Sequence, residues 1–212
     1  MSHHSNPTPP TMHRSTSATK RRRVSPRQRA AQRRHHRWLG WGIAAAVVVL
    51  AVAAVALGGR TSSSSVTGAA PPFQLESTAG TTVSLADYKG RSVLLYFNEG
   101  VGCDACFVEM AKLEADGGLV KAGVPIVPVV MNPSSQVAAE LQRFGIRTPY
   151  VVDPGGAVSR VYKTLGTGHH ANLPGHTFIL VGPDGTMKWR GDYPGMWVEP
   201  AELTAAVQAQ LR

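Results

Sequence analysis

The sequence predicts an α/β domain with a central mixed sheet flanked by helices, preceded by a single transmembrane helix. Three observations support this prediction. Residues 38–59 form an unbroken uncharged stretch, strand and helix patterns alternate after residue 73, and the only two cysteines lie three positions apart where a strand pattern gives way to a helix pattern. The chain of 212 residues accommodates one such domain plus an appendage.

Charge is distributed unevenly along the chain. The first 60 residues hold 11 of the 22 Lys and Arg residues and none of the 13 Asp and Glu residues, so the remainder carries a small net negative charge. The part long enough to bury a core therefore offers no basic stripe. This argues against a nucleic-acid-binding protein, although the whole chain has a pI of about 10.1.

The basic N-terminal part predicts a membrane anchor. Residues 1–37 are rich in Ser, Pro, His and Arg and predict a disordered basic cytoplasmic tail. Residues 38–59, as a helix rising about 1.5 Å per residue, would cover the roughly 30 Å hydrocarbon core. The preceding cations and the interfacial Trp38 and Trp41 place the N-terminus in the cytoplasm and the C-terminal domain outside the cell membrane.

A cleavable signal peptide is the alternative interpretation of this stretch. Ala54-Val55-Ala56 resembles a cleavage site, but the uncharged stretch is longer than a signal-peptide core, which favours an uncleaved single-pass span from Trp38 to Gly59. Residues 60–72 are rich in Ser, Gly and Pro and predict a flexible linker. The folded domain is then expected over residues 73–212.

The first half of this domain predicts alternating strands and helices. Short strands are expected over 73–75 and 82–85 as a hairpin, followed by a buried strand over 92–97. A helix over 106–119, a buried strand over 124–131 and a helix over 135–144 follow. This order implies a right-handed parallel unit.

The second half predicts an antiparallel hairpin and a final helix. Strands are expected over 177–181 and 187–190, around the turn residues 182–185. A helical insertion is expected over 157–165. A final helix starts near Pro200 and carries Leu203, Ala206, Val207 and Leu211 on one face. The complete order is a thioredoxin-like layout with an N-terminal β-hairpin extension.

The cysteine pair, Cys103 and Cys106, is the candidate catalytic site. A Cys-x-x-Cys pair at a helix N-terminus can close a small disulfide, and the backbone N–H groups there stabilise a thiolate. Cys103 would then be the outer nucleophile and Cys106 the resolving thiol. Asp104 works against this effect, because a nearby negative charge disfavours a second one.

Other roles for the pair are less consistent with its spacing. A disulfide between residues three positions apart would stabilise the fold little, because it closes a very short loop and hardly restricts the unfolded chain. A zinc site would need four ligands, and there is no second cysteine pair. Two unrelated buried thiols are the remaining alternative. The strand-to-helix position favours redox chemistry without a metal or other cofactor.

Two segments of the sequence resemble a known protein family. FQLESTAGTTVSLADYKGRSVLLYFNEGVGCDACFVEM, followed by HTFILVGPDGTMKWRGDY, is similar to the redoxin superfamily of alkyl hydroperoxide reductase/thiol-specific antioxidant (AhpC/TSA) proteins and membrane-anchored thioredoxin-like reductases. The resemblance covers residues 73–212. It implies either extracytoplasmic thiol:disulfide exchange, which in some members serves cytochrome c maturation, or hydroperoxide reduction by one peroxidatic cysteine.

The departures from the family patterns bear on the choice between these activities. Gly102 stands where thioredoxins have Trp, and Asp104-Ala105 replace Gly-Pro between the cysteines. In the Pro-x-x-x-Thr-x-x-Cys element of peroxiredoxins, Cys106 falls on the peroxidatic position. Cys103 replaces the Thr of that element and Glu99 its Pro, which weakens the peroxidase interpretation.

The resemblance also implies a substrate-positioning proline. Thioredoxin-like members place a cis-Pro just before the strand that matches 177–181, where its backbone pairs with the substrate chain. Pro174 is the nearest candidate, one residue further from the strand than usual, and an ordinary turn proline is the alternative.

Further polar residues gather near the pair in the expected fold. His169, His170 and His176 are the histidines of the domain, and two thiolates plus an imidazole suit Cu(I), so a copper-delivery module is the alternative from another functional class. Copper-delivery members resemble one another in a Cys-x-x-x-Cys spacing that this chain lacks. His176 is otherwise expected to cap or pack near the strand. Glu99 is a candidate proton relay or an ordinary loop carboxylate.

The function predicted from the sequence is a membrane-anchored extracytoplasmic thiol:disulfide oxidoreductase. Its partners would be a cysteine-containing protein substrate or a peroxide, and an external thiol electron donor, because a span without polar residues conducts no electrons. Peroxide reduction at Cys106, with Cys103 resolving, is the alternative that uses the same residues. The direction of the redox reaction stays open, because the potential depends on the surroundings of the sulfurs.

Overall fold

The computed structural model describes residues 62–64 and 67–211. The predicted cytoplasmic tail (1–37) and transmembrane helix (38–59) lie outside the described residues. Within the described ranges, none of the helices has the length and apolar character needed to cross a membrane.

The described residues form an eight-stranded mixed sheet with the order β1-β8-β7-β4-β5-β6-β2-β3. The pairs β4–β5 and β5–β6 are parallel, and the other neighbours are antiparallel. The strands are β1 (Ser62–Ser64), β2 (Gln74–Ser77), β3 (Thr82–Ser84), β4 (Val93–Phe97), β5 (Ile126–Val130), β6 (Val151–Val152), β7 (Thr177–Val181) and β8 (Met187–Asp192).

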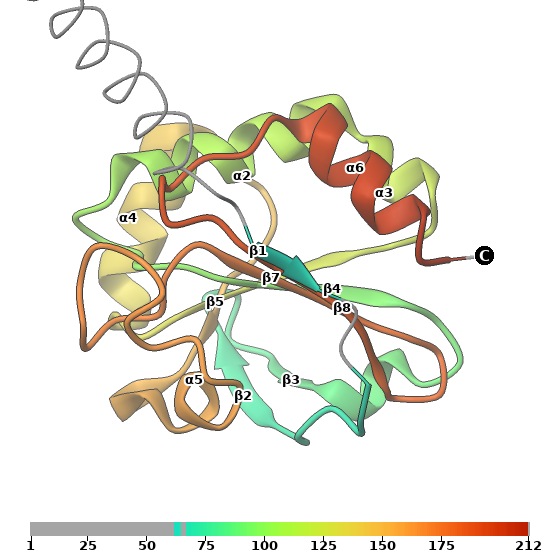
Figure 1. Cartoon of the computed structure of the whole chain (residues 1–212). Coiled ribbons are helices and arrows are strands. Elements are labelled where there is room, and N and C mark those ends of the chain that lie inside the picture. Colours follow the sequence, from blue (N-terminus) through green and yellow to red (C-terminus); the bar gives the residue numbers. More distant parts are fainter. Residues whose placement is uncertain (1–61, 65–66, 212) are drawn as a thin grey trace, which may run out of the picture. The chain divides into compact units, whose positions relative to one another are not determined.

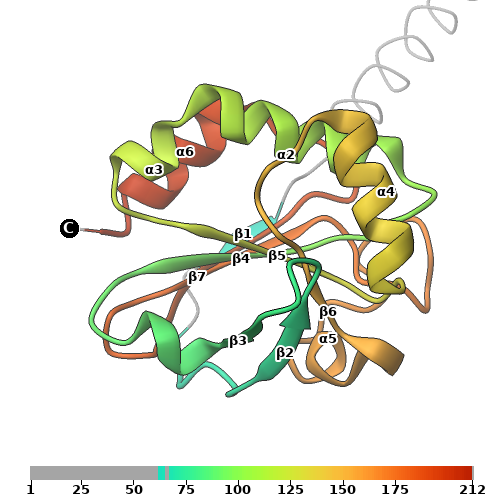
Figure 2. The same ribbon diagram turned by 180° about the vertical axis from the view of Figure 1, so that it is seen from behind.

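Helices cover the sheet unequally. The helices are α2 (Asp104–Asp116), α3 (Gly118–Lys121), α4 (Ser134–Phe144), α5 (Ala157–Val161) and α6 (Pro200–Gln208), and the 3-10 helices are η1 (Leu85–Tyr88) and η2 (Pro154–Gly156). Figures 1 and 2 show α2, α3, α4 and α6 over one face, while α5 and the β2–β3 hairpin lie on the other side.

The alternation of side chains along β4 divides the core in two. Leu94 and Tyr96 face the cluster under α2, α4 and α6, whereas Val93, Leu95 and Phe97 face the cluster on the other side. All five side chains are inaccessible to solvent. A continuous apolar run is thus required because both faces of this strand are covered.

The predicted elements of the first half are present with small shifts. The strands expected over 92–97 and 124–131 are β4 and β5, and the hairpin expected over 73–85 is β2–β3. The helix expected over 106–119 starts two residues earlier and breaks into α2 and α3. Gly117 has a φ of 63° there, in the left-handed region that ends helices.

Three expectations are corrected. Ser62–Ser64, expected in the flexible linker, forms edge strand β1 on β8, so ordered structure begins before residue 73. The helical insertion ends at Val161, well before residue 165. The final helix ends at Gln208, so Leu211 is 39% exposed and lies outside the apolar face predicted for it.

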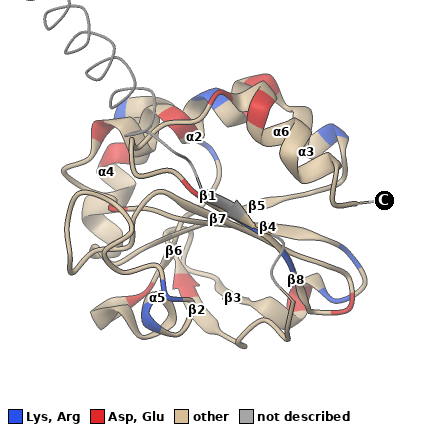
Figure 3. Ribbon diagram, in the orientation of Figure 1, with Lys and Arg blue, Asp and Glu red and all other residues tan. Residues whose placement is uncertain are grey.

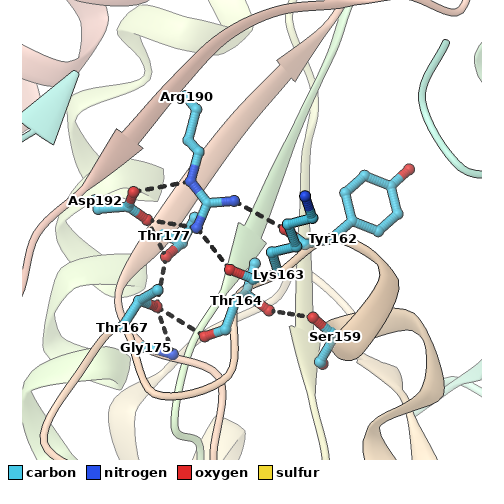
Figure 4. A network of polar contacts seen from close by, with 9 residues as sticks. All are labelled: Ser159, Tyr162, Lys163, Thr164, Thr167, Gly175, Thr177, Arg190 and Asp192. Atoms are coloured by element: carbon cyan, nitrogen blue, oxygen red, sulfur yellow. Dashed lines mark hydrogen bonds and ion pairs between the residues drawn. The ribbon is translucent and has the colours of Figure 1, made fainter. Parts of the chain in front are cut away.

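A polar network holds the segment 162–175 against β7 and β8 (Figure 4). Asp192 binds the Arg190 guanidinium through both carboxylate oxygens, at 2.8 and 2.9 Å, and accepts a 2.7 Å bond from the Thr177 hydroxyl. Thr177 in turn lies 2.9 Å from the Thr167 hydroxyl. Arg190 also donates to the carbonyl oxygens of residues 162 and 163. This network fixes the segment next to β7.

Charged side chains of both signs are spread over the helices and loops, as Figure 3 shows, and the central strands β4, β5 and β7 carry none. The described domain therefore presents mixed charge rather than a basic face, in keeping with the charge distribution of the sequence.

Candidate active site

The two cysteines lie on the turn that leads from β4 into α2. Asn98 stabilises this turn by accepting a 3.1 Å bond from the Gly100 N–H, and Asn132 accepts a 3.0 Å bond from the Val101 N–H. Gly100 has a φ of 73°, and a Cβ there would collide with the Asn132 side chain. Only glycine fits this position, because the left-handed backbone and the close approach both exclude a side chain.

Cys103 is the N-cap residue of α2, and Cys106 lies one turn further in. The two Sγ atoms are 2.8 Å apart, longer than the roughly 2.05 Å of a disulfide bond, and both residues are free thiols. Cys103 is half-buried, whereas Cys106 is completely buried. Only the first sulfur is therefore open to a substrate.

The surroundings separate the acidities of the two thiols. The pKa of Cys103 is lowered to about 7, chiefly because the Cys106 thiol donates a hydrogen bond to its sulfur; backbone N–H groups at the start of α2 act in the same direction. Partial burial and the Glu99 charge oppose this effect. The pKa of Cys106 is strongly raised, first by donating that bond and then by burial.

A buried imidazole lies behind Cys106. His176 Nδ1 is 3.9 Å from Cys106 Sγ, and the Tyr96 hydroxyl is 3.1 Å from both ring nitrogens of His176. Burial lowers the pKa of His176 to about 3, so the ring is neutral. The Tyr96 hydroxyl also lies 3.3 Å from the Cys106 carbonyl oxygen, to which it can donate.

A buried carboxyl group lies on the far side of this imidazole. Glu109 Oε2 is 3.8 Å from His176 Nε2 and accepts a 3.1 Å bond from the Val198 N–H, and both side chains are inaccessible to solvent. Burial raises the pKa of Glu109 to about 7. Its Oε1 has no hydrogen-bond partner among the described residues. Cys106, His176 and Glu109 thus form a buried row of titratable groups.

The carboxylate of Glu99 points to a different partner from the one expected. Glu99 Oε1 accepts bonds from the backbone N–H groups of His169 (2.7 Å) and His170 (3.0 Å), and Oε2 lies 2.8 Å from His170 Nδ1. Glu99 therefore anchors the 166–173 loop beside the cysteines. The carboxyl group aligned with Cys106 and His176 is that of Glu109.

The neighbourhood of Pro174 also differs from the expected cis-proline platform. The described residues contain no cis peptide bond, so Pro174 is trans. It forms an antiparallel bridge with Leu165, and the N–H of Gly175 donates to the Thr164 carbonyl oxygen (2.9 Å). The backbone around Pro174 is thus paired within the chain, and His176 is the residue of this segment that reaches Cys106.

The three histidines predicted near the pair have separate environments. His169 and His170 are exposed on the 166–173 loop, and only His176 is buried at the thiols. In residues 62–64 and 67–211, no group of three or more His, Cys, Asp and Glu side chains is arranged to hold a metal ion.

Two members of the site were not singled out from the sequence. Glu109 is three positions after Cys106, so both lie on the same side of α2. The sequence feature that could have revealed Glu109 is its position among residues of the helix pattern that are buried, such as Phe107 and Met110. Tyr96 belongs to the apolar run of β4, where a buried hydroxyl requires a polar partner.

Comparison with known proteins places this fold and cysteine pair in a family. The sequence model described as the AhpC/TSA family matches residues 66–190, more than half of the chain. The chain belongs to the AhpC/TSA family.

Curated relatives of this AhpC/TSA protein fall into two groups. It is 35% identical over 99 residues to the thiol-disulfide oxidoreductase ResA of Geobacillus thermodenitrificans, covering 46% of this chain and 56% of ResA. It is 29% identical over 98 residues to a Mycobacterium tuberculosis protein named as a peroxiredoxin, covering 46% of this chain and 62% of that protein. The chain thus spans about three fifths of the length of the curated relatives it matches.

The similar solved structures also include both peroxiredoxin-type proteins and disulfide oxidoreductases, and they share one fold. Enterococcus faecalis AhpC aligns with a TM-score of 0.60 at 19% identity, over 69% of this chain and 92% of AhpC. A secreted M. tuberculosis disulfide oxidoreductase homologous to Escherichia coli DsbE aligns with a TM-score of 0.52 at 17% identity, over 65% of this chain and 95% of that structure. The predicted thioredoxin-like fold is confirmed, but the fold alone does not select between the two activities.

Proposed function

We propose that this AhpC/TSA protein is a thiol:disulfide oxidoreductase that cycles Cys103 and Cys106 between dithiol and disulfide. One observation carries the proposal: the half-buried Cys103 has a pKa lowered to about 7, whereas Cys106 is buried with a raised pKa. Such an asymmetric pair contains one attacking thiolate and one protected resolving thiol.

In the first step, the Cys103 thiolate attacks one sulfur of a substrate disulfide. A bond forms between Cys103 Sγ and that sulfur, the substrate S–S bond breaks, and the leaving thiolate takes a proton from the solvent. Cys103 is suited to this step because its sulfur is accessible and substantially ionised near neutral pH.

In the second step, Cys106 resolves the mixed disulfide. Its thiol must lose a proton before its sulfur attacks Cys103 Sγ and releases the reduced substrate. The Glu109 carboxylate, with a pKa of about 7, is the stronger base of the buried row, and neutral His176 can relay the proton by accepting it at Nδ1 and giving one to Glu109 from Nε2. The two contacts measure 3.9 Å and 3.8 Å, and such distances commonly shorten in a reacting complex. Two electrons pass from the enzyme dithiol to the substrate, and an external thiol donor restores the dithiol.

Cysteine variants test this proposal. With insulin as the protein disulfide and dithiothreitol as the donor, Cys103→Ser should lower turnover on the order of a hundredfold or more, because the attacking sulfur is lost. Cys106→Ser should instead accumulate a mixed disulfide with insulin, visible on a non-reducing gel. Unchanged insulin reduction in both variants would contradict the proposal.

Peroxide reduction is the second candidate function, favoured by the peroxiredoxin-named relative. If the pair reduces peroxide, the burial and raised pKa of Cys106 favour Cys103 as the attacking thiol. Stopped-flow oxidation by hydrogen peroxide distinguishes the two assignments. Fast oxidation of Cys106→Ser with slow oxidation of Cys103→Ser would exclude Cys106 as the peroxidatic residue, and the reverse result would support it.

The cellular setting is part of the same proposal. The uncharged stretch 38–59 with basic residues before it supports a single-pass anchor with the N-terminus in the cytoplasm and the redox domain outside. A cysteine-containing protein would be the substrate. The copper-delivery alternative is supported only by the argument from the sequence, which is that two thiols and a nearby imidazole suit Cu(I).

A further inference from the structure

An ion pair joins Asp104, one of the two residues between the cysteines, to a neighbouring helix. Arg143, in the last turn of α4, donates from Nη1 to Asp104 Oδ1 (3.0 Å) and from Nη2 to Asp104 Oδ2 (2.8 Å). Asp104 is the first residue of α2 and follows Cys103 directly. A two-point contact between distant parts of the sequence thus lies next to the nucleophile.

The guanidinium of Arg143 is oriented by its surroundings. Its Cζ lies 4.6 Å from the centre of the Phe144 ring, and Phe144 stacks on Phe107 of α2 with ring centres 5.5 Å apart. Nη1 also donates to Glu140 at 3.0 Å. Exposed ion pairs usually contribute little because two long side chains must be ordered, but a stacked, two-point Arg–carboxylate contact has the favourable geometry.

The charge of Asp104 matters because of its position. A carboxylate beside Cys103 disfavours the thiolate and occupies the positive end of the α2 dipole, where the thiolate would otherwise be stabilised. A guanidinium bound to both carboxylate oxygens compensates this charge. Without Arg143, the Cys103 thiolate would face an uncompensated Asp104 as well as Glu99, which already raises the pKa of Cys103.

We propose that Arg143 is a positioning residue that tunes the redox equilibrium of the cysteine pair by neutralising Asp104. The proposal rests on the dithiol/disulfide cycle proposed above and concerns its thermodynamic direction. A stabilised thiolate favours the reduced protein and makes the disulfide a stronger oxidant. Arg143 therefore shifts the pair toward oxidising behaviour, and its removal shifts the pair toward reducing behaviour.

To test this, the full chain is equilibrated with glutathione buffers in mild detergent. The reaction measured is that of the protein dithiol with oxidised glutathione, which gives the protein disulfide and two molecules of reduced glutathione. Arg143→Gln should raise the equilibrium constant roughly threefold at low salt, which corresponds to a potential about 15 mV more negative for a two-electron couple. The pKa of Cys103, followed by thiolate absorbance, should rise as well. In 1 M salt both differences should shrink, because the Debye length falls to about 3 Å.

Two further variants separate electrostatics from structure. Arg147→Gln removes the same charge from the loop that follows α4, where Arg147 is 89% exposed and 4.0 Å from Glu114. Glu114 is ten residues after Asp104, about 15 Å along the helix, so this control should leave the equilibrium constant unchanged. In an Asp104→Asn background, Arg143→Gln should have a clearly smaller effect than in the wild type.

The outcomes separate this inference from the proposed function. Equal equilibrium constants and equal Cys103 pKa values for wild type, Arg143→Gln and Arg147→Gln would overturn the role of Arg143. So would a shift in Arg143→Gln that is independent of salt and of Asp104. If the wild-type chain itself formed no reversible disulfide with glutathione, the proposed redox cycle would fail instead.

Discussion

Glu109 and His176 face each other inside the protein, and burial moves their pKa values in opposite directions. The pKa of Glu109 is raised to about 7 from an ordinary value of 4.5, and that of His176 is lowered to about 3 from 6.5. Burial favours the neutral form in both cases. Near neutral pH, His176 is therefore neutral, and Glu109 is divided between its protonated and its ionised form.

These pKa values make stability depend on pH in a way that variants can test. Between pH 4.5 and 7 the folded chain keeps the Glu109 proton that the unfolded chain loses, so this residue lowers the free energy of unfolding as pH rises. His176 acts oppositely, lowering stability as pH falls from 6.5 toward 3. Glu109→Gln carries no titrating proton, so it should gain stability relative to wild type from pH 4.5 to pH 8, by up to about 3 kcal/mol.

Urea denaturation of the reduced proteins at both pH values measures this gain. The control is Glu202→Gln, which makes the same substitution at an exposed carboxylate of α6. A Glu109→Gln variant whose stability follows that of wild type at every pH would show that Glu109 ionises normally in the folded protein.

Individual site residues differed in how readily the sequence revealed them. Cys103 and Cys106 were apparent because they are the only cysteines and lie where a strand pattern becomes a helix pattern. Glu109 was not, because an acid on an amphipathic helix ordinarily faces water. Its burial depends on the chain near Val198 folding over α2 and donating to it, a contact between residues 89 positions apart.

At the scale of elements, the segment 164–175 brings His176 to the thiols. Within it, the backbone at residue 175 crosses that of residues 167 and 168: a Cβ on Gly175 would lie 2.2 Å from both Gly168 N and Thr167 C. No side chain fits between them. The crossing is further fixed by the Gly175 N–H, which donates to the Thr164 carbonyl oxygen and to the Thr167 hydroxyl, as Figure 4 shows.

Gly175→Ala tests this crossing. The added methyl group must push the two backbones apart, so the free energy of unfolding should fall by about 1–3 kcal/mol. Gly195→Ala is the matched control, because a Cβ at that exposed position meets nothing within 4 Å. Thermal or urea unfolding of both variants measures the difference. Equal stability of the two variants would show that the segment rearranges at no cost.

Continuous apolar runs located the central strands well, and short polar strands were missed. β4 and β7 are buried on both faces, so their sequences are apolar throughout and their bounds were predicted to within a residue. β1 consists of three serines and forms by pairing with the edge of β8. A sequence without an apolar pattern carries no local signal for such pairing, which depends on a free strand edge elsewhere in the fold.

At the scale of the whole molecule, the first 60 residues differ in character from the rest of the sequence. The first 60 residues hold basic residues and an uncharged stretch, whereas the cysteine pair lies within residues 66–190, the part matched by the AhpC/TSA family. The location outside the cytoplasm proposed above would require an external thiol donor, since the compartment there favours disulfides. In that setting, the redox equilibrium that we propose Arg143 to tune through Asp104 would act together with the supply of that donor.

The proposed topology can be tested with the two cysteines themselves, because the chain contains no others. After mild reduction of intact cells that express the full chain, a membrane-impermeant maleimide should label Cys103, which is half-buried and partly ionised at neutral pH. Cys103→Ser should lose most of this labelling, since the remaining Cys106 is completely buried. A chain without residues 1–60 should stay in the cytoplasm and be labelled only after cell lysis, because it lacks the predicted anchor. Labelling of the full chain only after the membrane is permeabilised would instead place the cysteine pair in the cytoplasm and overturn the proposed orientation.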